Sequence, residues 1–346
     1  MRRFVFGILI LLLLAMPVSA AEWTAPTAPD SAEDLMPVET ESFGEGLWEI
    51  LTAAIRKLEP ELAEAAGICL SLIAVVMIVS VLRKMTEKGG QITDFAASLA
   101  IGGILLYHTN SLIRLGADTV TELSDYGKLL LPVMTGALAA QGGVTSSTAL
   151  YAGTVLFDTL LSTAISKLLI PMVYMFLALA VANGATGDDA LKKLGDFVKW
   201  LMTWFLKIVL YVFTGYMGIT GVISGTADAA SVKATKLTIS GMVPVVGGIL
   251  ADASETVIVG AGVMKSAVGV YGLLAVIAVW ISPFLQIGVQ YLLLKATAAV
   301  CGVFGVKRAS DLIQSFSVCM GLLLAMTGTV CFFLLISTVC FMKGVS

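Results

Sequence analysis

The sequence predicts an all-α, polytopic integral membrane protein, with about six to eight transmembrane helices that follow an N-terminal signal peptide. Hydrophobic residues make up 58% of the 346 residues and charged residues only 13%, whereas about 25% of the residues of a soluble domain are charged. Several apolar runs approach the ~20 residues that a helix needs to cross a bilayer. Some runs contain proline and glycine, so we expect broken or re-entrant segments among the spans. The net charge of -3, without a cluster of basic and aromatic residues, argues against nucleic-acid binding and leaves the lipid bilayer as the expected environment.

The first 60 residues predict an export signal and a leader. Arg2 and Arg3 precede an apolar run at positions 4–16, and small residues lead to a cleavage position after Ala20. Residues 1–20 are therefore interpreted as a signal peptide, because the run is short for an anchor; a retained first helix is the alternative. Residues 21–60 predict an exported acidic leader with a short amphipathic helix from Phe43 onward. The multi-span membrane domain then occupies residues 61–346.

The first clear span is predicted at residues 62–82. Arg83, Lys84 and Lys88 follow it and place this turn in the cytoplasm by the positive-inside rule. Residues 116–128 predict a mildly acidic outer loop, and the apolar run at 129–143, interrupted by Pro132, is too short and broken for a regular span. Further apolar runs lie at 95–113, 150–165, 168–181, 197–223, 268–280, 283–303 and 316–341, of which 150–165 and 168–181 are either spans or one hairpin.

The stretch at residues 214–262 changes from apolar to polar and back, and it is neither a plain span nor a plain loop. One interpretation is a packed helix hairpin with a polar turn, because small residues allow close helix contact. The other is a re-entrant or pore-facing element, because proline and glycine interrupt regular helix. The candidate helix-packing residues are Gly215, Gly218, Gly221, Gly225, Pro244, Gly247 and Gly248. The candidate polar residues of a pore or loop are Asp228, Lys233, Asp252, Glu255 and Lys265.

Three isolated polar residues lie within or beside apolar runs. His108, the single histidine, is interpreted as an interfacial residue at a helix end rather than as part of a proton relay, because no acidic partner is evident. Lys207 is expected to extend toward the headgroups. Lys295 is predicted to face the bundle interior or to lie near a helix end, because a charge facing lipid is costly.

Catalytic chemistry finds no support in the sequence. Residues 260–266 resemble a phosphate-binding loop, but Met264 replaces the required glycine. The five cysteines are far apart or in apolar runs and are interpreted as buried small residues. We therefore predict no catalytic residue, cofactor site or metal site.

Two runs resemble a known family. The sequence YMGITGVISG at residues 216–225, followed by Ala227–Ala230 and Lys233, is similar to the signature region of stage III sporulation protein AE, and so is VPVVGGILADA at residues 243–253. The resemblance implies a role in endospore formation, within the secretion-like complex that joins the mother cell to the engulfed forespore. It implies as partners other stage III sporulation A-type membrane proteins, their ATPase and a forespore protein. It also implies a place in the mother-cell membrane around the forespore, with the leader toward the intermembrane space.

Two functions from different classes therefore remain open at this point. The first is a structural or conduit subunit of that trans-envelope channel. The second is a stand-alone transporter or permease for a small solute, with its site near the broken segments.

Overall fold

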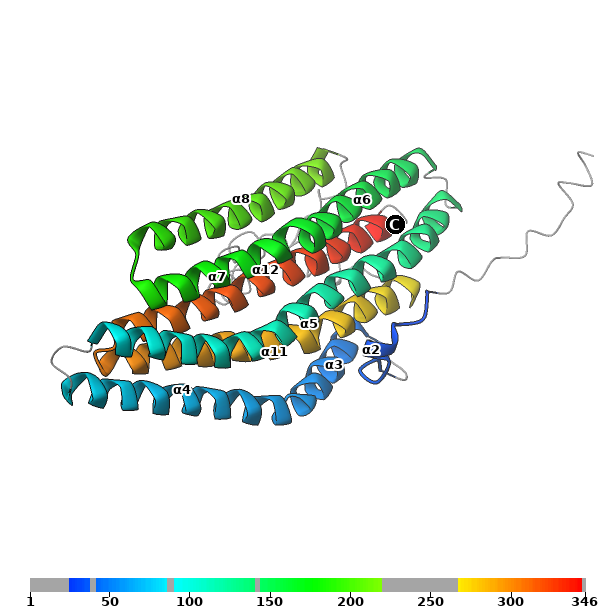
Figure 1. Ribbon diagram of the computed structural model, residues 1–346. Helices are drawn as coiled ribbons and strands as arrows, with labels where there is room; N and C mark the ends of the chain where they lie inside the picture. The colour runs from blue at the N-terminus through cyan, green and yellow to red at the C-terminus, as the bar shows by residue number, and fades with distance from the viewer. Residues whose placement is uncertain (1–24, 38–41, 86–89, 141–143, 220–266, 344–346) are drawn as a thin grey trace, which may run out of the picture.

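The computed structural model describes residues 25–37, 42–85, 90–140, 144–219 and 267–343, and every regular element in these ranges is helical. Long helices run side by side in one bundle (Figure 1). The elements are α2 (Asp30–Glu33), α3 (Phe43–Lys57), α4 (Glu59–Met85), α5 (Gly90–Ala140), α6 (Val144–Ala164), the π-helical turn η1 (Ile165–Leu169), α7 (Ile170–Thr186), α8 (Asp189–Ile219), α11 (Ala267–Val303) and α12 (Lys307–Lys343).

The centre of the bundle is the antiparallel pair α11 and α12. The most apolar stretch of α12 is wholly buried by the rest of the chain, whereas only half of the corresponding stretch of α11 is. α5 and α7 pack along α12, and α3 and α4 pack along α11. The C-terminal hydrophobic sequence, without a charge from Leu312 to Met342, therefore forms the core around which the other helices are arranged.

Six of the described helical stretches are long and apolar enough to cross a membrane: Glu59–Met85, Ile92–Ala137, Leu150–Thr186, Asp189–Met217, Val268–Val303 and Lys307–Met342. This confirms the predicted all-α, polytopic fold. Most of these helices exceed the ~20 residues of one span; α11 and α12, with 37 residues each, are about 55 Å long. The bundle is thus longer than the ~30 Å hydrocarbon core of a bilayer.

The predicted outer loop at residues 116–128 is wrong, because these residues are an uninterrupted part of α5. Asp118, Thr121, Asp125 and Lys128 are exposed at helical spacing, while Leu123, Tyr126 and Leu130 are buried. The apolar run at 129–143 is likewise not a separate broken segment, because its residues up to 140, including Pro132, continue α5. Neighbouring helices provide the packing that makes proline tolerable inside a helix of this kind.

Two further breaks predicted from the sequence are absent. The runs at 268–280 and 283–303 form the single helix α11, with Pro283 inside it. The runs at 150–165 and 168–181 are neither two spans nor a hairpin, because α6, η1 and α7 follow one another in one direction. His108 also lies within α5 rather than at a helix end, and its Nδ1 lies 3.4 Å from Oε1 of Glu64 on α4.

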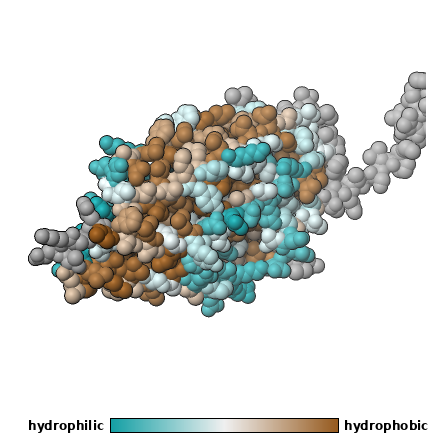
Figure 2. Space-filling view, in the orientation of Figure 1, coloured by the Kyte–Doolittle hydropathy of each residue, from teal (hydrophilic) through white to brown (hydrophobic). Residues whose placement is uncertain are grey.

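One end of the bundle, here called the basic end, carries the end of α4, the beginning of α5 and the turns between α7 and α8 and between α11 and α12 (Figure 1, left). Six basic residues gather there: Arg83, Lys84, Lys192, Lys193, Lys307 and Arg308. The opposite, distal end carries α2, α3 and the end of α12. Figure 2 shows hydrophobic surface over much of the basic half and hydrophilic surface over α3 and the distal half of α5 on the same face.

Candidate functional site

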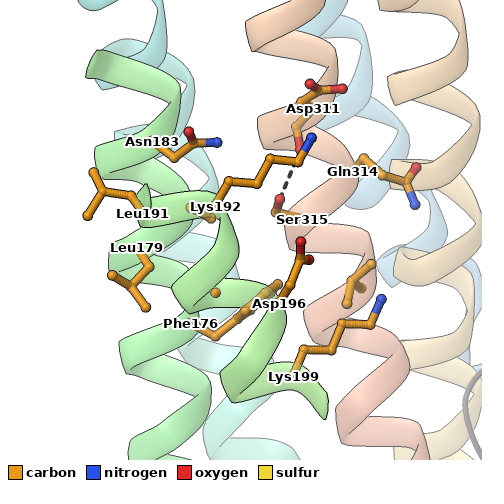
Figure 3. A pocket seen from close by; sticks show the side chains of 13 residues that line it. Phe176, Leu179, Asn183, Leu191, Lys192, Asp196, Lys199, Asp311, Gln314 and Ser315 are labelled. Atoms are coloured by element: carbon orange, nitrogen blue, oxygen red, sulfur yellow. Dashed lines mark hydrogen bonds between the residues drawn. The ribbon is translucent and has the colours of Figure 1, made fainter. Parts of the chain in front are cut away.

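A charged groove lies between α7, α8 and α12 close to the basic end (Figure 3). It encloses a cavity of about 300 Å³. Its walls are Phe176, Leu179, Ala180 and Asn183 of α7, Leu191, Lys192, Gly195, Asp196 and Lys199 of α8, and Asp311, Gln314, Ser315 and Val318 of α12. The groove therefore combines an apolar floor with two lysines, two aspartates, two amides and a hydroxyl.

The charges of the groove do not neutralise one another directly. Lys192, Asp196 and Lys199 extend from α8 toward α12, where the Asp311 side chain lies (Figure 3). Among the described residues, no ion pair joins these lysines to either carboxylate. The Ser315 hydroxyl donates to the backbone carbonyl of Asp311, at 2.9 Å, and not to the Asp311 carboxylate. Such a site can bind cations, anions or uncharged polar groups.

The turn between α7 and α8 positions the groove. α7 ends at Gly187, whose φ of 73° is the left-handed conformation that glycine adopts without strain. Asp188 then caps α8, because its Oδ1 accepts from the Ala190 backbone N–H at 2.9 Å. Gly195 faces α7, and a Cβ there would come within 3.9 Å of the Phe176 ring. This small residue brings α8 close to α7 beside the groove.

A buried carboxylate joins α4, α5 and α12 near the groove. The side chain of Asp94 on α5 is 7% exposed, and it lies 3.5 Å from Nε of Arg83 and 3.7 Å from Nη1 of Arg308. These are ion-pair distances rather than hydrogen bonds. Ser98 donates to the Gly184 carbonyl at 2.7 Å, which joins α5 to α7. The ends of α4, α5, α7 and α12 are thus held by polar contacts at the basic end.

A second polar site lies farther toward the distal end, between α5 and α6. Asp158 is 3% exposed, and its Oδ2 accepts from the Ser124 hydroxyl at 2.7 Å. Its Oδ1 and the Thr154 hydroxyl, one turn away, are buried without a hydrogen-bond partner. An ionisable residue inside a membrane bundle is costly and commonly marks a functional position. The sequence analysis did not select Asp158, although it interrupts the apolar run at 150–165.

Most of the site residues predicted from the sequence lie outside the described residues: Gly221, Gly225, Asp228, Lys233, Pro244, Gly247, Gly248, Asp252, Glu255 and Lys265. Gly218 lies in α8. Gly215 is exposed on α8, and a Cβ there would meet no atom within 4 Å. The predicted roles of these residues in packing or in a polar site stay predictions.

Among the described residues, close glycine packing occurs at two glycines that were not selected from the sequence, Gly127 and Gly272. A Cβ on Gly127 of α5 would lie 2.6 Å from Leu334 of α12, and one on Gly272 of α11 would lie 2.8 Å from Leu130 of α5. Gly127 falls one turn from Leu123 and Leu130, so its helical spacing on a buried face was the available signal.

The isolated lysines have different surroundings. Lys295 is exposed, so the alternative that it faces the bundle interior is wrong; it lies in the last quarter of α11, which agrees with the alternative of a position near a helix end. Its Nζ donates to Oη of Tyr291 at 3.1 Å. Lys207 is half-buried on α8. Neither lysine belongs to the charged groove.

The fold and the groove define the class as a polytopic α-helical membrane protein with charged residues inside its bundle. The profile of the stage III sporulation protein AE family matches residues 32–344, and the chain belongs to this family. It is 21% identical over 250 residues to the stage III sporulation protein AE of Bacillus subtilis (strain 168). That match covers 70% of this chain and 62% of the relative. No solved structure matches the chain. The family resemblance inferred from residues 216–253 is thereby confirmed.

Proposed function

We propose that the protein is a membrane core subunit of the secretion-like channel complex that links the mother cell to the forespore, and that forespore development after engulfment requires it. The observation that carries this proposal is the family match over residues 32–344, which includes all six candidate spans. The proposed partners are other stage III sporulation A-type membrane proteins, their ATPase and a forespore protein.

The proposed location is the mother-cell membrane around the forespore. The six basic residues of the basic end support a cytoplasmic position for that end by the positive-inside rule. The distal end, with α2, α3 and the exposed polar stripe of α5, would then face the intermembrane space. In this arrangement residues 1–20 act as the signal peptide that exports the leader.

Deletion of the gene in its host tests the proposal. We expect normal engulfment, followed by loss of late forespore-specific reporter activity and of spore yield, and restoration of both by the wild-type gene. Companion channel proteins should be lost from their sites or from pull-downs in the deletion strain. Normal sporulation of the deletion strain would reject the proposed role.

The charged groove favours one alternative, a stand-alone transporter or permease for a small solute. This function predicts solute uptake or efflux by the purified protein in liposomes without companion proteins. The channel-subunit proposal predicts no such autonomous transport, so a reconstituted flux that groove substitutions abolish would favour the transporter.

A further inference from the structure

The charged groove lies at a level of the bundle where α8 also carries exposed apolar side chains, such as Leu194, Phe197 and Trp200. α8 begins at Asp189 at the basic end, so Asp196 and Lys199 lie about 10 and 15 Å along its axis. The latter distance would be about half of a ~30 Å hydrocarbon core that began at the first residue of α8. Exposed apolar side chains already occur at the basic end itself: Met85 is 78% exposed, Ile92 77% and Val303 86%. Hydrocarbon is therefore expected around the bundle at the depth of the groove.

α8 presents two different exposed faces at this depth. Phe197, Trp200 and Trp204 form a stacked aromatic row, with exposed fractions of 55%, 55% and 48%. Lys192, Asp196 and Lys199 lie on a separate stripe at the helical spacing i, i+4 and i+7, and this stripe lines the groove. The aromatic row suits lipid, whereas the charged stripe does not.

Lysine side chains alone would not require water at this depth, because they can extend toward the headgroups. Asp196 is too short to do so, and it is exposed to the groove without an ion-pair partner among the described residues. An unpaired carboxylate at membrane depth is tolerated where it lines a water-filled cavity. A cavity of about 300 Å³ is large enough to hold several water molecules.

We propose that the groove between α7, α8 and α12 is a water-filled vestibule, open at the basic end, that admits water and small hydrophilic ions into the bundle to the level of Lys199. Phe176, Leu179 and Val318 are among the apolar residues of its wall. Farther along α8, Phe213 stacks against Phe333 of α12, with 3.6 Å between the ring centroids. The vestibule thus lies on the basic-end side of this aromatic contact. Its opening to the cytoplasm rests on the orientation given under Proposed function; its hydration does not.

Cysteine accessibility tests the vestibule with a matched control on the next residue. Lys199→Cys and Trp200→Cys lie at the same depth on different faces of α8, and the wild-type chain supplies the background because its five cysteines are buried. Each full-length variant is treated in inverted membrane vesicles with a charged, membrane-impermeant methanethiosulfonate. The thiolate is the reacting species, and it forms in water rather than in lipid. We expect labelling of Lys199→Cys to be about tenfold or more faster than labelling of Trp200→Cys. Ser315→Cys, on the opposite wall, should label at a rate similar to Lys199→Cys and shows that the result does not depend on one variant.

Each other outcome overturns part of the proposal. Equally slow labelling of both α8 variants would show that water does not reach Lys199. Equally fast labelling would show that this part of α8 lies in water altogether rather than beside lipid. Fast labelling of Lys199→Cys in intact protoplasts but not in inverted vesicles would overturn the cytoplasmic opening. None of these results depends on sporulation, so the vestibule and the proposed function are tested separately.

Discussion

Replacement of Gly272 by alanine tests whether α11 and α5 are in direct contact through a glycine. The new Cβ would lie 2.8 and 3.1 Å from Cδ1 and Cδ2 of Leu130, where an ordinary contact is 3.4–4 Å. Leu130 is fully buried, so its methyl groups have no free space to enter. Since both methyl groups are too close, either the Leu130 side chain changes its rotamer within the core or one of the helices shifts.

The expected magnitude follows from two opposing effects. Overpacking of a core costs about 1–3 kcal/mol. Alanine stabilises a helix interior by about 0.5–1 kcal/mol relative to glycine. The net result is a loss of about 1 kcal/mol, which lowers the Tm by roughly 2 °C for a protein of this size. Thermal unfolding of the purified protein in detergent measures this change.

Gly215→Ala is the matched control, because it is also a helix-interior substitution but meets no atom within 4 Å. It should raise the stability by about 0.5–1 kcal/mol, the opposite sign. A loss at Gly215 would instead support the helix-packing role predicted for it from the sequence.

A double substitution isolates the contact itself. Leu130→Ala alone should cost about 2–5 kcal/mol, because it opens a cavity beside Gly272. Combined with Gly272→Ala, the loss should be smaller than the sum by about 1 kcal/mol, since the new methyl group enters that cavity. Simple additivity of the two changes would refute the close approach of α5 and α11.

Three further substitutions probe polar contacts and turn geometry by the same unfolding assay. Asp94→Asn should lower the free energy of unfolding by about 1–2 kcal/mol, because two partly exposed arginines lose their buried carboxylate partner. A change below about 0.5 kcal/mol would show that these ion pairs do not hold the basic end together. Gly187→Ala should lower the free energy of unfolding more than Gly305→Ala does. Both glycines have a positive φ, 73° and 76°, which costs a residue with a Cβ about 1–2 kcal/mol. Only at Gly187 would the new Cβ also meet a side chain, that of Arg308. Equal losses would show that Arg308 moves aside freely. Asp158→Ala should lower the free energy of unfolding by about 1–3 kcal/mol, because the Ser124 hydroxyl loses its acceptor. Asp158→Asn retains an oxygen at this position and should lower it less. The reverse order would show that this hydrogen bond does not stabilise the fold.

The placement of helix breaks shows where sequence reasoning failed. Pro132 and Pro283 suggested interruptions, and the charges of residues 116–128 suggested a loop, yet all of these lie inside long helices. Proline disrupts an isolated helix, but packing against neighbours offsets the lost backbone hydrogen bond. Charged residues end a span only when they surround the helix; on one face they form a solvent-exposed stripe.

The candidate site was missed for a related reason. Lys192, Asp196 and Lys199 were not selected from the sequence, although their spacing places them on one face of α8. Their periodicity was available in the sequence. Their convergence with Asp311, more than a hundred residues later, was not, because it depends on which face of α12 packs beside α8.

The sequence by itself determined the class of environment, the helical fold and the family, because the apolar composition, the length of the apolar runs and the motif at residues 216–253 are properties of the linear chain. Only the tertiary structure decided that α12 is the buried centre, that Asp94 joins the helix ends and that four charges share one groove. The physical reason is that each of these features joins helices far apart in sequence, and helix packing depends on side-chain shape across two surfaces rather than on the periodicity of one.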